Sequence, residues 1–292
     1  MVLWLVGTIA FLALHVAGDP VSLLVSEDAT PLERQTLRQA YGLEQPLLVQ
    51  YFIFWKNAAQ GELGNSFYSQ QSAMHLLLER LPATLGLVLL GLTLGLLLGV
   101  PLGVLSAAKA GSSFDRILQG LCAVFISAPS FWIGIVLIHL FAVQWRLLPS
   151  QGSGTVWHLI LPAVTLALPR AAVYVQILRL ELLEVLSQDF IRTARAKGVL
   201  ETRVLYHHAL RNCFVPFVTV FGLQLSGLLS GAVITESLFA YPGMNRLALD
   251  AMNRLDIPVI LAFVLLSAFL FASINFLTDL GYVLIDPRVR YE

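Results

Sequence analysis

The sequence carries little charge for its length. Only 12% of its 292 residues are Asp, Glu, Lys or Arg, 57% are hydrophobic, and the mean hydropathy is +0.78. About a quarter of the residues of a soluble domain are charged, because its surface must stay hydrated. The composition therefore excludes a soluble globular protein and indicates a polytopic membrane protein.

Other features are missing as well. The formal net charge is zero, so no basic excess indicates nucleic acid as a partner. The only cysteines, Cys122 and Cys213, lie within or beside apolar runs, so no disulfide framework is expected. The chain has no G-x-x-x-x-G-K-[ST], H-E-x-x-H or C-x-x-C motif. His207 and His208 would point in different directions on a helix, and the other histidines are scattered. We predict no catalytic site, cofactor site or metal site in this chain, and no enzyme.

Six apolar runs are present, and all but the first, which is short for a span, are long enough to cross a hydrocarbon core about 30 Å thick. They are Met1–Val16, Pro82–Ala107, Ile117–Val143, Leu159–Leu180, Phe214–Thr235 and Ile257–Val283. We therefore predict an all-α polytopic membrane protein with about six transmembrane helices. Residues 1–17 form the first helix, residues 18–80 an outer, periplasmic loop, and residues 81–292 a core with the other five.

Basic residues favour an orientation with both termini in the cytoplasm. The inside segments then carry Lys109, Arg116, Arg179, Arg192, Arg195, Lys197, Arg203, Arg211, Arg288 and Arg290. The first run could be interpreted as a signal peptide, but it lacks a basic start, and "HVAGDP" is a poor cleavage site. We expect instead a span whose upstream cytoplasmic residues precede this numbering.

The outer loop has the pattern of a folded segment. Thr30 is placed as an N-cap, with Pro31 at the first helical position and Glu33 completing a capping box, and Gly42 is a natural helix stop. A second amphipathic stretch covers residues 46–59, before a turn at "GELGNS". An ordinary loop remains the alternative, but size and order favour a docking surface.

Small residues and prolines mark the apolar runs. Gly91, Gly95, Gly99 and Gly103 recur every four residues, a ridge that lets another helix approach closely, so we predict helix packing. The fifth run repeats the device with Gly222, Ser226 and Ser230, and with Gly227 and Gly231 beside them. Kinks are expected at Pro101, Pro129 and Pro169.

Arg170 lies near the middle of the fourth run. A cation there costs at least ~3 kcal/mol on insertion scales, so its side chain should face protein or water. One interpretation is a residue of a translocation path that meets an anionic substrate group. The other is a structural pair, with Glu236 or with a neighbouring subunit.

A polar, basic segment, residues 187–212, separates the fourth and fifth runs. It contains "QDFIRTARAKGVLETRVLYHHALRN", rich in helix formers, with Gly198 able to form a turn. We predict a helix–turn–helix element at the inner face of the membrane. Contact with anionic lipid is the simpler interpretation of its charge.

At this segment the chain resembles the permeases of binding-protein-dependent ABC importers, in particular the dipeptide, oligopeptide and nickel branch. The resemblance continues along the chain. Its further matches are "GDP" (18–20), "YGLEQPLLVQY" (41–51), "LPAT" (81–84), "SAPSFWIGI" (127–135), "HLILPAVTLAL" (158–168), "ESLFAYPGM" (236–244) and the closing "DPRVRY".

The resemblance implies a type I importer permease in the bacterial inner membrane, with this segment, the coupling segment (187–212), docked on an ATPase. The implied contact residues are Arg192, Thr193, Ala194, Arg195, Ala196, Lys197 and Gly198. The implied partners are a second homologous permease, two ATPase subunits that bind ATP and Mg, a periplasmic solute-binding protein that meets the outer loop, and the lipid bilayer.

The coupling segment departs from the general family motif. That motif begins Glu-Ala-Ala and has a glycine four residues after the second alanine, whereas this chain has Arg192, Thr193 and Ala194, followed by Gly198. A basic residue thus replaces an acidic one. We therefore expect the ATPase groups that contact this position to carry the opposite charge from those that meet the general motif.

Alternatives from other classes are an ion-driven secondary carrier and a receptor or scaffold without transport. A carrier needs ionisable groups near the midplane, where Arg170 stands almost alone. For the substrate we place small peptides first, and nickel or another chelated metal second.

Overall fold

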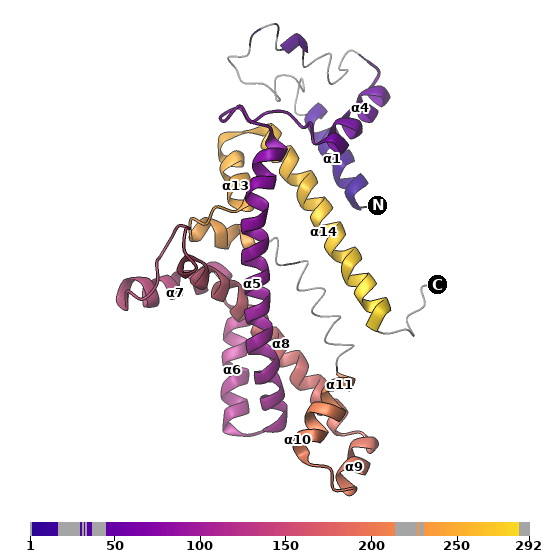
Figure 1. The fold of residues 1–292 in the computed structure, drawn as a ribbon, viewed down its shortest axis with the longest axis vertical. Coiled ribbons are helices and arrows are strands. Elements are labelled where there is room, and N and C mark those ends of the chain that lie inside the picture. Colours follow the sequence, from indigo (N-terminus) through magenta and orange to yellow (C-terminus); the bar gives the residue numbers. More distant parts are fainter. Residues whose placement is uncertain are drawn as a thin grey trace. The chain divides into compact units, whose positions relative to one another are not determined.

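The computed structural model describes residues 2–16, 30, 32, 34–36, 45–213, 227 and 231–285. Within these residues every regular element is a helix, and one isolated β-bridge joins Asn65 and Ser72 (Figure 1). The all-α prediction is confirmed. The chain divides into two compact units, Met1–Thr84 with Pro242–Ser273, and Leu85–Tyr241 with Ile274–Glu292.

Three helices in the described residues are long and apolar enough to cross a membrane. They are α5 (Ala73–Ala108), α8 (Trp157–Leu186) and α14 (Ile257–Ile285), which match the second, fourth and sixth predicted runs. The first run forms α1 (Val2–Val16), an apolar helix of only 15 residues. Most of the fifth run, with Gly222, Ser226 and Ser230, lies outside the described residues, as does most of the predicted capping box.

The third predicted span is broken. α6 (Ser113–Ser127) ends before Pro129, and α7 (Ser130–Leu137) with the π-helical η1 (Ile138–Gln144) continues at a bend of 110°. Proline disfavours the helical conformation in the residue before it, and Ala128 is extended at φ −73° and ψ 133°. The kink predicted at Pro129 is therefore a full break, whereas Pro101 and Pro169 lie within continuous helices.

In the first unit, α1 packs on the amphipathic α4 (Leu47–Gln60). The ring of Phe11 lies 5.3 Å from that of Tyr51 and 5.6 Å from that of Phe54, centroid to centroid. Gly61 ends α4 in the left-handed conformation at φ +76°, which glycine adopts without strain. The predicted second amphipathic stretch is thus a helix.

In the second unit, the glycines of α5 lie against α8. A Cβ on Gly91 would stand 2.9 Å from the Cβ of Leu166, and one on Gly99 only 2.7 Å from the Cβ of Tyr174. A Cβ on Gly103 would lie 3.1 Å from the Cβ of Leu178, and one on Gly95 would lie 3.4 Å from the Ala167 carbonyl oxygen. α6 covers another side of α8, through a buried cluster of Leu118, Cys122, Ala172 and Val175. Close approach of α5 to α8 therefore depends on residues without a side chain.

We expect Gly99→Ala to lower the free energy of unfolding by about 1–3 kcal/mol, because the added methyl group overpacks the α5–α8 contact. Gly86→Ala is the matched control on the same helix, since no atom lies within 4 Å of the Cβ position there. Thermal unfolding of both variants in detergent measures the difference. Equal stability of the two would contradict a tight contact at Gly99.

Candidate functional site

The coupling segment forms a chain of short helical turns. α9 (Asp189–Ala196) is followed by a turn at Gly198, and then by α10 (Glu201–Arg203), the π-helical η2 (Val204–Ala209) and α11 (Leu210–Asn212). Gly198 has φ +78°, a conformation that costs other residues about 1–2 kcal/mol. The helix–turn–helix prediction therefore matches the described backbone, with Gly198 at the turn.

Hydrogen bonds close this turn. The Gly198 amide donates to the Arg195 carbonyl at 2.9 Å, and the Arg195 guanidinium binds both carboxylate oxygens of Glu201, at 3.1 and 2.6 Å. This hydrogen bonding holds the pKa of the Glu201 carboxyl below its usual range. Because both side chains are largely exposed, the pair adds little stability and mainly orders the turn.

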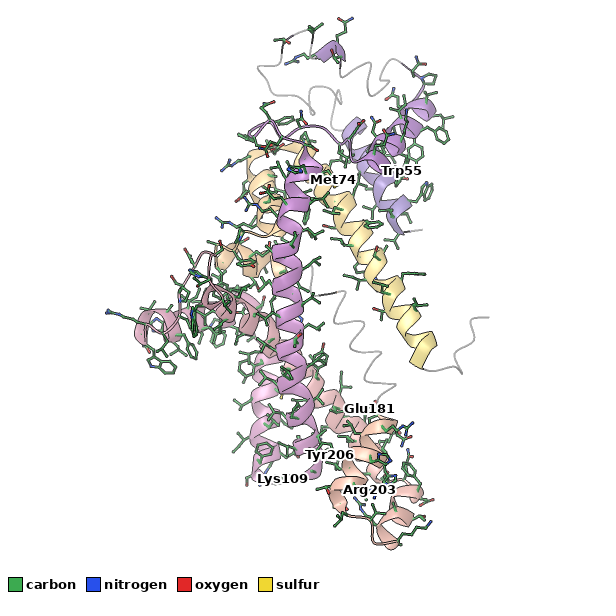
Figure 2. The ribbon with its side chains drawn as sticks, in the orientation of Figure 1. Trp55, Met74, Lys109, Glu181, Arg203 and Tyr206 are labelled. Carbon is green, nitrogen blue, oxygen red and sulfur yellow. The ribbon has the colours of Figure 1, made fainter. Side chains whose placement is uncertain are left out.

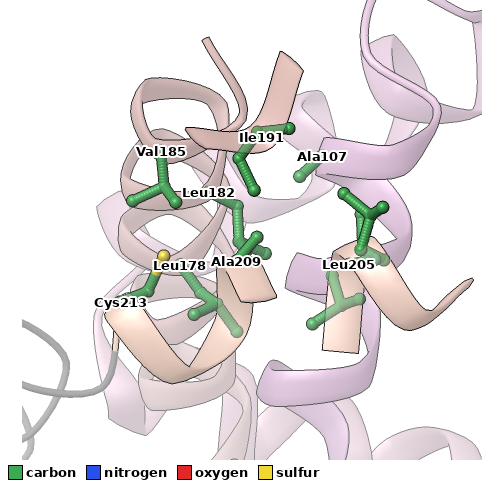
Figure 3. Packing of buried hydrophobic residues seen from close by; sticks show 10 residues of the cluster. Ala107, Leu178, Leu182, Val185, Ile191, Leu205, Ala209 and Cys213 are labelled. Atoms are coloured by element: carbon green, nitrogen blue, oxygen red, sulfur yellow. The ribbon is translucent and has the colours of Figure 1, made fainter. Parts of the chain in front are cut away.

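One face of the coupling segment is buried against α5 and α8. Ile191 is fully buried on this face, as are Val204 and Ala209 of η2. They join one cluster with residues at the ends of α5 and α8 (Figure 3). The cluster consists of Val104, Ala107, Leu178, Leu182, Val185, Ile191, Val204, Leu205, Ala209 and Cys213. A force on the coupling segment would thus reach both helices through packed side chains.

The opposite face is exposed and basic. Six of the seven predicted contact residues are exposed, namely Arg192, Thr193, Arg195, Ala196, Lys197 and Gly198, and Ala194 is half-buried. Phe190, Leu200 and Tyr206 are exposed apolar residues of the same segment, Leu200 to 75%. Figure 2 shows Arg203 and Tyr206 toward the same end of this unit as Lys109 of α5. The arrangement suits a protein partner with apolar and acidic groups.

An ion pair between the buried Asp115 and the partly buried Arg179 joins the start of α6 to α8. The Arg179 guanidinium donates to both carboxylate oxygens of Asp115, each at 2.7 Å. Asp115 also accepts from the Ser106 hydroxyl at 2.5 Å and the Gly111 amide at 2.9 Å. Sequence reasoning missed Asp115, although an acidic residue two positions before an apolar run was the available signal. The pair fixes α5, its turn into α6, and α8 together.

Arg170 is held within the second unit, where no described carboxylate pairs with it. Its Nη1 donates to the Leu166 carbonyl at 2.8 Å, and its buried Nε has no hydrogen-bond partner among the residues that the structure describes. Its Cβ lies 3.6 Å from the position of a Cβ on Gly95, and its Nη2 lies 3.1 Å from that on Gly231. No carboxylate of the described residues forms an ion pair with Arg170, so a pair with Glu236 is not formed there.

Metal-binding groups are sparse in the described part of the chain. No group of three or more His, Cys, Asp or Glu residues is placed to hold a metal ion there. His207 and His208 are adjacent on η2, with ring centroids 5.3 Å apart and nearly perpendicular planes.

Two family models match this chain. The model of the binding-protein-dependent transport system inner membrane component matches residues 99–291. The model of the N-terminal part of such membrane components matches residues 1–88. Together they cover nearly the whole sequence.

Full-length relatives also match. A protein named probable peptide ABC transporter permease protein y4tP, from Sinorhizobium fredii, is 40% identical over 99% of this chain and 96% of its own length. The glutathione transport system permease protein GsiC of Escherichia coli K12 is 37% identical over 99% of this chain and 95% of its own. A chain of the inward-facing MetNI methionine ABC transporter aligns with a TM-score of 0.62 at 19% identity, over 73% of this chain and 97% of that one. This last likeness is one of fold.

We expect Arg179→Met to lower the melting temperature by several degrees, because Asp115 would keep its charge without its bidentate partner. Exchanging the two residues, as Asp115→Arg with Arg179→Asp, should restore part of the loss. Arg116→Met is the control, since Arg116 is exposed and close by. Thermal unfolding compares the variants, and equal melting of Arg116→Met and Arg179→Met would disprove a structural role for the pair.

Proposed function

The chain belongs to the family of binding-protein-dependent transport system inner membrane components, and we propose that it forms half of a translocation pathway for small peptides. It is a multi-pass permease subunit of an ABC importer. A second homologous permease supplies the other half. The family is one of transporter permeases, and no catalytic step is assigned to this chain.

The coupling segment carries the proposal. Its exposed basic face is backed by a buried cluster that includes the ends of α5 and α8. A partner that grips this face can therefore move two membrane helices. ATP-driven approach of two ATPase subunits is the motion that such a lever converts into inward- and outward-facing states.

ATP and Mg are bound and used by the ATPase partners in this proposal, since the chain has no P-loop motif of its own. The docking groove on the ATPase carries acidic groups, because Arg192 and Lys197 present positive charge where the general family motif begins with an acidic residue. We place the coupling segment and both chain termini in the cytoplasm, because the basic residues favour that orientation. The outer loop then faces the solute-binding protein.

Small peptides are the proposed substrate. The relatives reported above are named for peptides and for glutathione, itself a small peptide-like compound with carboxylates. Arg170 is a cation within a membrane helix, and no described residue bonds its Nε, so the side chain suits a substrate carboxylate. Nickel as a chelate is the second candidate, and the relatives' names do not favour it.

Substitution of Gly198 tests the coupling role. Gly198→Val should reduce uptake, because a β-branched residue resists the left-handed conformation at φ +78°. A cost of about 1–2 kcal/mol for that conformation would leave about tenfold fewer properly formed turns. Gly198→Asn is the matched control, since asparagine tolerates this conformation and no atom lies within 4 Å of the Cβ position. Uptake and ATP hydrolysis are measured in the complete reconstituted transporter. Undiminished uptake by Gly198→Val would remove the coupling assignment.

Uptake by cells with and without the gene tests the substrate, with labelled dipeptide and labelled nickel side by side. Loss of dipeptide uptake alone is expected. For Arg170, the sharper comparison is a peptide with a free terminal carboxylate against its amide. Wild type should prefer the carboxylate, and Arg170→Met should lose this preference, since only a charge contact distinguishes the two. An unchanged preference, with lower stability, would assign Arg170 a structural role.

A further inference from the structure

α4 packs against the middle of α1, not beside one of its ends. The indole of Trp55 fills a notch at Gly7, where a Cβ would lie 2.5 Å from two ring carbons (Figure 2). The hydroxyls of Thr8 and Tyr51 share a hydrogen bond of 2.8 Å, and the Phe11 ring contacts that of Tyr51 edge-on. Since α1 runs from residue 2 to residue 16, α4 lies at the depth of its central turns.

The surface that α1 leaves uncovered is apolar. Between Val2 and Ala13 every exposed residue is aliphatic or aromatic, and Trp4, Ile9 and Leu12 are each more than half exposed. In a multi-pass membrane protein such a surface belongs against the acyl chains of the lipid. Because α4 lies beside the central turns of α1, lipid surrounds the pair at this depth.

The side of α4 that faces away from α1 is apolar over its first two turns. Leu48 and Phe52 stand one turn apart and are 75% and 71% exposed, and Leu47 before them is 63% exposed. Lys56 continues the same line one turn further and is exposed, and α4 contains no Asp or Glu. An apolar face that ends in a lysine is typical of a helix at a membrane interface, because the long lysine stem reaches the phosphates from apolar surroundings.

α4 is too short to cross the membrane by itself. Its 14 residues extend over about 21 Å, whereas the hydrocarbon core is about 30 Å thick. Gly61 then turns the chain away from the helix axis. The helix can therefore occupy one leaflet only.

We propose that α4 is a lipid-binding helix of the outer loop, embedded in the outer leaflet with Leu48 and Phe52 among the acyl chains and Lys56 at the phospholipid phosphates. The inference rests on the proposed function and its orientation, in which the loop between the first two spans is outside. Lipid fits better than a protein partner, because α1 and α4 are packed as a pair and the exposed face of α1 itself needs lipid. One helix of the predicted periplasmic loop is thus a membrane segment.

The test attaches a spin label at single cysteines in the complete transporter, in nanodiscs of phosphatidylethanolamine and phosphatidylglycerol. Phe52→Cys is the test position, Ile9→Cys the lipid reference and Glu62→Cys the water reference, each in a background with Cys122→Ala and Cys213→Ala. Collisions of the label with oxygen, which concentrates in lipid, are compared with collisions with chromium oxalate, which stays in water. The ratio of oxygen to oxalate collisions at position 52 should be several-fold higher than at position 62, and close to that at position 9.

Two results would overturn the proposal. Frequent oxalate collisions at position 52, as at position 62, would place α4 in water as part of an ordinary loop. Protection from both reagents would instead assign the exposed face to a protein contact, such as the second permease. Peptide uptake by the same variants in proteoliposomes is measured separately, so a failure of the proposed function would appear there. A water-exposed position 52 in an active transporter would overturn this inference alone.

A charge at the same position gives a second test that needs no label. Phe52→Asp should lower the melting temperature of the transporter in nanodiscs by several degrees, because a carboxylate would be placed among acyl chains. Phe52→Leu, which keeps an apolar side chain, is the matched control and should melt like the wild type. Equal melting temperatures of Phe52→Asp and Phe52→Leu would contradict a lipid environment for this face.

Discussion

The close contact between α5 and α8 is the constraint on which the second unit depends. With glycine at every fourth position from Gly91 to Gly103, the two backbones approach so closely that a methyl group at Gly91 or Gly99 would clash. That approach brings Val104 and Ala107 of α5 into one buried cluster with Leu178 and Leu182 of α8. The buried face of the coupling segment packs on this cluster. In a bilayer, where lipid is as apolar as leucine, such shape matching replaces the hydrophobic effect as the force between helices.

Sequence patterns predicted the elements of this site better than their contacts. Helix-forming residues and Gly198 sufficed to predict the helix–turn–helix of the coupling segment, because local propensity and one left-handed position determine it. The break at Pro129 was underestimated, since a kink and a 110° bend follow from the same residue and differ only in what packs around it. The ion pair between Asp115 and Arg179 joins residues far apart in the chain, and a single sequence does not show which distant residues meet in the fold.

Arg170 illustrates a limit of a different kind. Its cost in the membrane can be read from the sequence, and so can the need for a compensating environment. The choice between a substrate contact and an ion pair depends on where carboxylates lie in three dimensions. In the described residues the Arg170 guanidinium bonds the Leu166 carbonyl and forms no ion pair with Glu236, and the choice between the two roles stays a prediction.

α8 runs without interruption from Trp157 to Leu186 and carries Arg170, Arg179 and part of the coupling cluster. Two ligands that act on one rigid element are thermodynamically linked, and linkage is reciprocal. If cargo held at Arg170 changes the affinity of the coupling segment for the ATPase, then the ATPase changes the affinity for cargo by the same factor. In the proposed importer, one continuous helix would then be enough for the ATPase to sense cargo occupancy, with no separate signalling element.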